Sequence, residues 1–400
     1  MYLFIEPLDV LLFRDSRPFA AGETHRAKQQ FPPLPTALQG AIRTAILARA
    51  GVDLSRPFDD QAQVFGLVGN SASNYGCLRI RGPFLARRKD NPQDVEVLFP
   101  APMNALVRKS TDGSDSISFL YPRQDEQSKL PEGWAVNGFD EFRPLKSAES
   151  GSAEAAQGYW LTIDGLIGLL KGGAPSGSSV VVRKAEIFGE EYRFGIELDH
   201  SKRTAASGKL YAAEFVRMRE NFGFVVEVGL DGDSGDGELE KYLDSKGILA
   251  LGGERRAASY EKVEAGQLDG YKLVTNFNDR DKGFFLYLAT PAIFRPNGPG
   301  SPGWLPSWID EKNLTSTCGS AKYKVIAAAV GKPVPISGWD MRKRRPKPLL
   351  RAVPAGSVYF CELTEGNMQA IVQGLHNQTI SEFGKEIGMG LTFVGRWNYV

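Results

Sequence analysis

Side chains that could perform acid–base chemistry near neutral pH are scarce in this sequence. It contains three histidines, His25, His200 and His376, and histidine is the side chain whose charge normally changes in that range. Only His25, close to Arg26 and Lys28, has the cationic neighbours that a metal-free ribonuclease would use. A phosphate contact or an ordinary loop histidine explains His25 more simply than catalysis does.

Signatures of other catalytic classes are missing. No G-x-x-x-x-G-K-[ST], H-E-x-x-H or G-x-S-x-G pattern occurs. The acidic run 231–238 resembles a calcium loop, but Tyr242 stands where the bidentate glutamate would be required. The three cysteines lie far apart, without metal-ligand spacing. The sequence therefore predicts a protein that is not an enzyme and carries no cofactor or metal.

The densest group of cations is the run Arg342-Lys343-Arg344-Arg345-Pro346-Lys347. Its five charges repel one another, and a nucleic-acid backbone would relieve that repulsion while it releases condensed counterions. Trp339, just upstream, could offer a surface on which bases stack. The run indicates a flexible cation cluster that binds a polyanion, and the alternative is a solvated surface loop.

Two glycine-containing motifs could also approach an anionic ligand. Gly252 and Gly253 precede Arg255 and Arg256, so the backbone could come close to a ligand while the guanidinium groups bind phosphate through two hydrogen bonds each. Helix C-cap glycines would look the same. Near the end of the chain, the glycines of 388–390 could present backbone N–H groups to phosphates, or simply form a turn before a last strand.

The elements that must position these residues alternate between strands and helices. A first strand spans about 1–13, and the clearest helix follows the rigid segment 31–35. Thr36 and Gln39 in that helix have the spacing of a capping box. A second cycle of strands and helices begins at Glu214, so the pattern predicts an α+β protein with two sandwiches in tandem.

The domain bounds follow from this repetition. We expect an N-terminal domain at 1–205, with polar insertions at 110–118 and 146–158, and a C-terminal domain at 206–400 that ends in the glycine-rich loop. Arg43 lies off the apolar stripe of the first helix, free to reach outward, and Arg14 and Arg17 lie among aromatic side chains.

Composition restricts the class of protein. The chain has 400 residues, 48 basic and 47 acidic side chains and a net charge of +1. Charge is nevertheless segregated, because 342–351 holds only basic and 231–240 only acidic charged side chains, so one face could bind a polyanion. The sequence shows no secretory leader and no apolar run long enough for a bilayer, and it predicts a cytoplasmic protein.

Taken in order, several segments resemble the RAMP superfamily, and specifically the third subunit of the Cmr (type III-B CRISPR-Cas) effector complex. Each matching stretch is modest, and the combination is specific because it spans nearly the whole chain. The matching stretches are 5–9, 14–19, 31–35, 40–43, 251–255, 335–340, 352–359 and the terminal glycine loop.

This resemblance implies two tandem ferredoxin-like (RRM-like) domains with loop insertions and a C-terminal glycine-rich loop. It also implies a non-catalytic, RNA-binding role in antiviral defence, in which the protein holds the 5′ tag of the guide RNA (crRNA). Its expected protein partners are the large polymerase-like subunit and the first backbone RAMP subunit. The predicted RNA-binding residues are Arg14, Arg17, His25, Arg43, Arg255, Arg256, Arg342, Lys343, Arg344, Arg345, Lys347, Gly388, Gly390 and Arg396.

Two alternatives remain open at this point. One is a guide-processing RAMP endoribonuclease that uses His25. The other is the equivalent subunit of a type III-A complex, which the stretches Pro335–Trp339 and Val353–Ser357 disfavour. Members of the family often carry an aromatic residue between the terminal glycines, whereas Met389 stands there in this chain.

Overall fold

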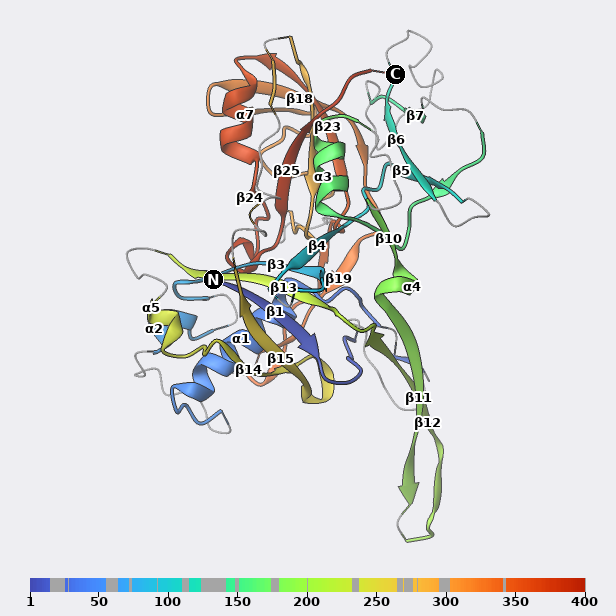
Figure 1. Cartoon of the computed structure of the whole chain (residues 1–400), viewed down its shortest axis with the longest axis vertical. Helices are drawn as coiled ribbons and strands as arrows, with labels where there is room; N and C mark the ends of the chain where they lie inside the picture. Colours follow the sequence, from blue (N-terminus) through green and yellow to red (C-terminus); the bar gives the residue numbers. More distant parts are fainter. Residues whose placement is uncertain are drawn as a thin grey trace. The chain divides into compact units, whose positions relative to one another are not determined.

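A computed structural model describes most of the chain as two compact units (Figure 1). The described residues are 1–14, 26–27, 29–54, 64–71, 74–91, 93–109, 115–123, 142–147, 151–173, 180–199, 201–231, 237–264, 269, 276–278, 280–294, 303–340 and 343–399. Unit 1 comprises 1–95, 184–265 and 335–350, and unit 2 comprises 96–183, 266–334 and 351–400. Each unit thus draws on three separate segments. The sequential division at 205/206 stays a prediction.

Unit 1 contains five neighbouring strands of a larger sheet, in the order β3-β13-β1-β15-β14, and each pairs antiparallel with the next. The central strand is almost wholly apolar, and the residues from Tyr2 to Ile5 are buried. The strands are β1 (Tyr2–Pro7), β3 (Leu78–Arg88), β13 (Phe222–Leu230), β14 (Lys246–Leu251) and β15 (Arg256–Val263).

Helix α1 (Pro35–Arg49) contacts β3 and β14 of this sheet. Proline at its first position is pre-set for helical φ, and Leu38, Ile42 and Ile46 form the buried face. The predicted capping box is wrong, because the N-cap lies two residues before Thr36: Leu34 is the N-cap and gives no side-chain cap, and Gln39 is buried.

The remaining elements of unit 1 include a long hairpin of β11 (Phe188–Asp199) and β12 (Thr204–Met218), which Figure 1 shows as a two-stranded ribbon. We call it the long hairpin. β2 pairs with β12 in parallel. The shorter elements are β2 (Arg26–Ala27), α2 (Val64–Val68), α4 (Lys184–Ile187), α5 (Gly237–Glu240), the 3-10 turn Gly253–Arg255, β20 (Trp339–Asp340) and β21 (Arg345–Pro346).

Unit 2 centres on a sheet with the order β17-β18-β23-β16-β25-β24. Helix α7 (Met368–Leu375) begins at Asn367, whose side chain accepts a hydrogen bond from the N–H of Ala370. The strands are β16 (Gly283–Leu288), β17 (Thr315–Cys318), β18 (Ala321–Ala329), β23 (Val358–Glu365), β24 (Gln378–Thr379) and β25 (Leu391–Arg396). Aromatic and aliphatic side chains of these strands and of α7 form one core.

Smaller strands complete unit 2. β7-β6-β5-β8 form a second sheet, and β9 pairs with both β4 and β10. The elements are β4 (Val95–Pro100), β5 (Ala105–Arg108), β6 (Ser116–Pro122), β7 (Leu145–Ser147), β8 (Glu154–Ala155), β9 (Tyr159–Leu161), α3 (Ile163–Leu170), β10 (Val181–Arg183) and the 3-10 turn Lys385–Ile387. β19 (Val334–Ile336) and β22 (Leu350–Ala352) flank the last segment of unit 1.

The fold is therefore α+β, rich in strands and with few helices among the described residues, as the class prediction required. The predicted insertions 110–118 and 146–158 lie partly outside the described residues. Their described parts lie next to or within the short strands β5 to β8. Within the residues that the structure covers, no helix is long and apolar enough to cross a membrane.

Candidate nucleic-acid interface

The cationic run of unit 1 forms an ordered hairpin in its described part. β20 and β21 pair antiparallel, with Trp339 opposite Pro346 and Asp340 opposite Arg345. The carboxylate of Asp340 accepts a hydrogen bond from the N–H of Lys343 at 3.0 Å, which closes the turn. In the structure, part of the predicted cation cluster thus pairs as short strands, and its flexibility stays a prediction. We call the described residues 339–340 and 343–347 the basic hairpin.

The basic hairpin presents its charges to solvent. Lys343, Arg344 and Arg345 are exposed, and the indole of Trp339 is 55% exposed. Arg344 lies at the turn with φ 48°, in the left-handed region. Arg342 lies outside the described residues. The arrangement places an aromatic face beside three solvated cations, which are the two features that a single-stranded nucleic acid requires.

Lys347 and Arg43 are exceptions to this exposure. Burial lowers the pKa of Lys347, and the charge of Arg43 lowers it further, whereas Asp340 opposes the shift. The guanidinium of Arg43 donates to the carbonyls of Ser71, at 3.1 Å, and Gly69. The prediction that Arg43 is free to reach outward is wrong, because its donors support the segment after α2. Whether Arg43 contacts RNA stays a prediction.

The paired glycines of the second motif approach the chain's own backbone. A Cβ atom at Gly252, where φ is +75°, would lie 2.6 Å from the carbonyl oxygen of Leu12. The N–H of Gly253 donates to the same oxygen at 2.7 Å. These glycines therefore allow the turn before β15 to lie against the segment after β1. This contact within the chain explains the paired glycines more simply than the approach of a ligand does.

The two arginines of this motif have different surroundings. Arg255 is exposed, with φ 50°, and its guanidinium has no ion pair within the described part of the chain. Arg256 is half-buried, and its guanidinium contacts the carboxylates of Asp9 at 3.4 Å and Glu254 at 2.6 Å. Arg255 is therefore the better placed of the two for a phosphate.

Asp9 gathers two further arginines from the long hairpin. Arg217 on β12 lies 3.3 Å from its carboxylate and Arg193 on β11 lies 4.0 Å away. Both also contact Glu191 on β11, at 2.8 and 2.7 Å. The guanidinium carbons of Arg193 and Arg256 lie 5.0 and 5.2 Å from the ring centre of Phe215. We call Asp9, Glu191, Arg193, Phe215, Arg217, Glu254 and Arg256 the Asp9 cluster.

The charges of the Asp9 cluster compensate one another. A backbone hydrogen bond from Val10 and the charges of its three arginines lower the pKa of Asp9. Hydrogen bonds from Arg193 and Arg217 lower the pKa of Glu191. Three cations therefore face three carboxylates, so the cluster offers little attraction to an incoming phosphate.

The opposite face of the long hairpin is apolar and exposed. Because successive strand residues alternate between faces, Tyr192, Phe194, Ile196 and Leu198 of β11 lie opposite the side that contacts Asp9. All four are exposed, and Phe194 reaches 74%. Sequence reasoning missed this hairpin. The strict alternation of large apolar residues over 192–198 was the signal that could have found it.

The terminal glycine loop does not present a row of unused donors. The N–H of Gly388 donates to Lys385, that of Met389 to Gly384, and that of Gly390 to Pro291. The loop is buried, and Met389 is fully buried. The expected nest of free N–H groups is therefore wrong at 388–390. RNA contacts of Gly388 and Gly390 by other means stay a prediction.

The other predicted residues have mixed outcomes. The Nε of Arg396 donates to the carbonyl of Lys171 at 2.6 Å, which satisfies an acceptor at the C-terminal end of α3. Arg14 is exposed beside Gln29, with which it forms an isolated β-bridge. Arg17 and His25 lie outside the described residues. Among the residues that the structure covers, no group of acidic, histidine or cysteine side chains is placed to hold a metal.

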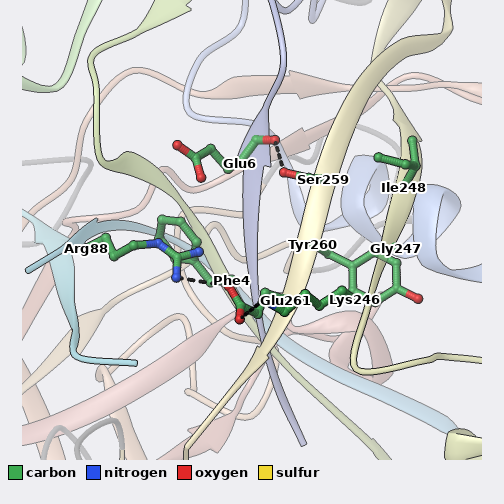
Figure 2. Close-up of a pocket in the computed structure, with 9 residues that line it drawn as sticks. All are labelled: Phe4, Glu6, Arg88, Lys246, Gly247, Ile248, Ser259, Tyr260 and Glu261. Atoms are coloured by element: carbon green, nitrogen blue, oxygen red, sulfur yellow. Dashed lines mark hydrogen bonds and ion pairs between the residues drawn. The ribbon is translucent and has the colours of Figure 1, made fainter. Parts of the chain in front are cut away.

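A depression of about 410 Å³ lies on unit 1 between β1, β14 and β15 (Figure 2). The carboxylate of Glu261 pairs with Arg88 at 3.1 Å and with Lys246 at 2.8 Å. Lys246 and then Arg88 lower the pKa of Glu261. The guanidinium carbon of Arg88 lies 4.4 Å from the ring centre of Phe4. Since Glu6 adds a second carboxylate to the lining, the charges are balanced and do not favour a phosphate.

Comparisons with solved structures found weak overall similarity. One match is to a chain of a type III-B Cmr-beta structure bound to cognate target RNA and AMPPnP, with 18% identity over 90% of this chain and 86% of that chain and a TM-score of 0.46. Another is to a chain of a type III-B Cmr-beta structure bound to cognate target RNA, with 17% identity over 97% of this chain and 95% of that chain and a TM-score of 0.46. A third match is to a chain of a Csm3-Csm4 subcomplex of the type III-A interference complex, with 10% identity over 99% of each chain and a TM-score of 0.39. With TM-scores below 0.5, these similarities carry no argument.

The comparison of the sequence with protein families identifies the family of this chain. No curated protein matches the chain significantly. The model of the family described as CRISPR-associated protein (Cas_Cmr3) matches residues 3–397. The chain therefore belongs to the Cas_Cmr3 family of CRISPR-associated proteins, as the resemblance of its motifs predicted, and is a subunit of a type III-B CRISPR effector.

Proposed function

We propose that this protein is a non-catalytic subunit that binds the guide RNA in a type III-B effector. The observation that carries the proposal is the basic hairpin, where Lys343, Arg344 and Arg345 are exposed beside the exposed indole of Trp339. Phosphates would contact the cations while an unpaired base stacks on the indole.

The long hairpin supports the same proposal. Tyr192 and Phe194 are exposed on a narrow two-stranded ribbon, and unpaired RNA bases stack on aromatic side chains of this kind. The neighbouring Ile196 and Leu198 extend the apolar face. A base displaced from its neighbours would be sheltered from water against this face.

The finer assignments follow from membership of the family. We infer that the chain holds two ferredoxin-like domains, that the RNA it binds is the 5′ tag of the guide, and that its protein partners are the large polymerase-like subunit and the first backbone subunit. The family match is to the type III-B subunit, so we do not retain the type III-A alternative.

The test compares RNA binding by wild type and by Trp339→Ala. Purified protein is titrated with guide RNA bearing the 5′ tag, with the same RNA lacking the tag, and with duplex RNA of equal length. We expect the tagged single strand to bind best and Trp339→Ala to lower its affinity about fivefold or more, because stacking on one base contributes about 1–3 kcal/mol. Tyr242→Ala, at a half-buried aromatic residue outside both hairpins, serves as the control. Equal affinities of wild type for all three RNAs would contradict the proposal.

The non-catalytic part needs its own measurement. Labelled guide RNA is incubated with the protein, with magnesium and with a chelator, and resolved on a denaturing gel. We expect intact RNA in both conditions. Discrete fragments that disappear in His25→Ala would instead support the endoribonuclease alternative.

Docking is tested by co-elution. The protein and the large subunit are mixed at micromolar concentration in moderate salt, without RNA. We expect one complex, held by an interface of at least about 1,000 Å². Separate elution would exclude direct docking of these two subunits.

A further inference from the structure

Asp9 links three strands of unit 1 that are distant in sequence. Its carboxylate lies within 4.0 Å of arginines from β11, β12 and the start of β15. β15 belongs to the same sheet as β1, whereas β11 and β12 form the long hairpin. The carboxylate is therefore the point at which the hairpin and the sheet share charges.

Two other contacts join the same places. Leu11 and Val216 exchange backbone hydrogen bonds of 2.8 and 2.9 Å. Val10, Leu12, Ala213 and Phe215 form a small buried apolar cluster next to this bridge. The segment after β1 thus contacts the base of the hairpin through backbone, apolar and charged groups together.

The strand register of the long hairpin determines which face of the ribbon makes these contacts. Glu191 is opposite Phe215, and Gly189 is opposite Arg217, so the side chains that contact Asp9 all lie on one face of the ribbon. The exposed apolar residues from Tyr192 to Leu198 lie on the other face. Holding the first face therefore fixes the direction in which the second is presented.

We infer that Asp9 is a positioning residue that holds the long hairpin in one orientation relative to the sheet strands β1 and β15 of unit 1. A two-stranded ribbon is at best marginally stable by itself in water, so the direction of this one depends on its base. Since three carboxylates compensate the three arginines, the Asp9 cluster serves contact within the chain and not binding of an anion. The value of a fixed orientation for RNA binding rests on the proposed function, whereas the orientation itself does not.

The experiment measures hydrogen exchange of backbone amides in the full chain without RNA. Asp9→Asn removes the charge and keeps the shape. We expect amides in 189–193 and 213–217 to exchange about three- to tenfold faster, because several partly exposed ion pairs are lost together. Amides of β1 should keep their wild-type rates. Asp9→Glu, which restores the charge, should return exchange towards the wild-type rate.

Glu190→Gln is the matched control. Glu190 lies on the same strand but pairs with Lys184 of α4, so its loss should leave exchange of 213–217 unchanged. Unchanged exchange in Asp9→Asn would overturn the inference. Equally faster exchange in β1 would also overturn it, because Asp9 would then support the fold as a whole.

RNA affinity of Asp9→Asn is measured separately. Faster exchange in the hairpin together with weaker RNA binding supports both the inference and the proposed function. Faster exchange with unchanged affinity supports the inference and shows that the hairpin takes no part in RNA binding.

Discussion

The basic hairpin and the Asp9 cluster both contain several arginines of unit 1, but, among their described residues, only in the Asp9 cluster do carboxylates pair with them. In the basic hairpin, Arg344 and Arg345 are solvated, and the only carboxylate in residues 339–347, that of Asp340, closes the turn. In the Asp9 cluster each arginine contacts one carboxylate at 2.6 to 2.8 Å and that of Asp9 at 3.3 to 4.0 Å. Arginine content alone therefore does not distinguish the two regions, because the position of the carboxylates decides whether the cations are compensated.

The largest expected effect comes from removing the solvated charges. Replacing Lys343, Arg344 and Arg345 together by glutamine should weaken binding of tagged and untagged RNA by about a hundredfold at low salt. The slope of log affinity against log salt should become shallower by about 0.7 for each lost phosphate contact. Filter binding over a salt series measures both quantities. The comparison variant is Arg193→Gln with Arg217→Gln, which should leave the salt slope unchanged because these arginines are already paired with carboxylates. An unchanged slope in the triple variant would remove the contrast between the two regions.

A smaller effect is expected from Gly252→Ala. The added methyl would meet the carbonyl of Leu12 at 2.6 Å, at a φ of +75°, so we expect a loss of about 1–3 kcal/mol in the free energy of unfolding. Chemical denaturation measures it. Gly237→Ala is a suitable control, since a methyl there meets nothing within 4 Å. A stable variant with weakened RNA binding would restore the ligand-approach interpretation of these glycines.

Substitutions of Arg255 and of Arg256 should have different effects, and both effects should be smaller still. Arg255→Ala should lower affinity for tagged RNA about fivefold, because an exposed guanidinium is lost. Arg256→Ala should instead loosen the base of the long hairpin, with the exchange pattern of Asp9→Asn. Equal effects of the two substitutions on RNA affinity, with no change in exchange, would contradict the distinction.

The effect of pH should be the smallest near neutrality. The pKa values of Asp9 and Glu191 are both lowered in the fold. A carboxyl with a lowered pKa contributes stability above its unfolded pKa and loses that contribution as pH falls through its folded pKa. Hairpin exchange, corrected for its intrinsic pH dependence, should therefore stay constant from pH 8 to 5 and accelerate only below about pH 4. Acceleration between pH 7 and 6 would show that a different group holds the hairpin.

The sequence predicted the family, the α+β class, the first helix and the terminal strand, because these follow from local patterns and ordered motifs. It did not predict how Gly252 is used, because the contact with Leu12 joins positions far apart in the chain. The same holds for Arg256, whose partner Asp9 is 247 positions away. Arg396 was expected to contact RNA, but its Nε donates to Lys171 of another element. The motifs thus identified the family, while the contacts of their residues within the chain required the fold.

The interleaving of the two units has a consequence for synthesis of the protein. Unit 1 includes residues 335–350, and the basic hairpin lies within them. A growing chain emerges from its N-terminus at about 5–20 residues per second, so the sheet of unit 1 is available well before this last segment. The solvated cations can join unit 1 only after most of unit 2 has been translated. The nascent chain should therefore acquire the basic hairpin, the surface that we propose binds RNA, only after the sheet strands of unit 1 and most of unit 2 have been translated.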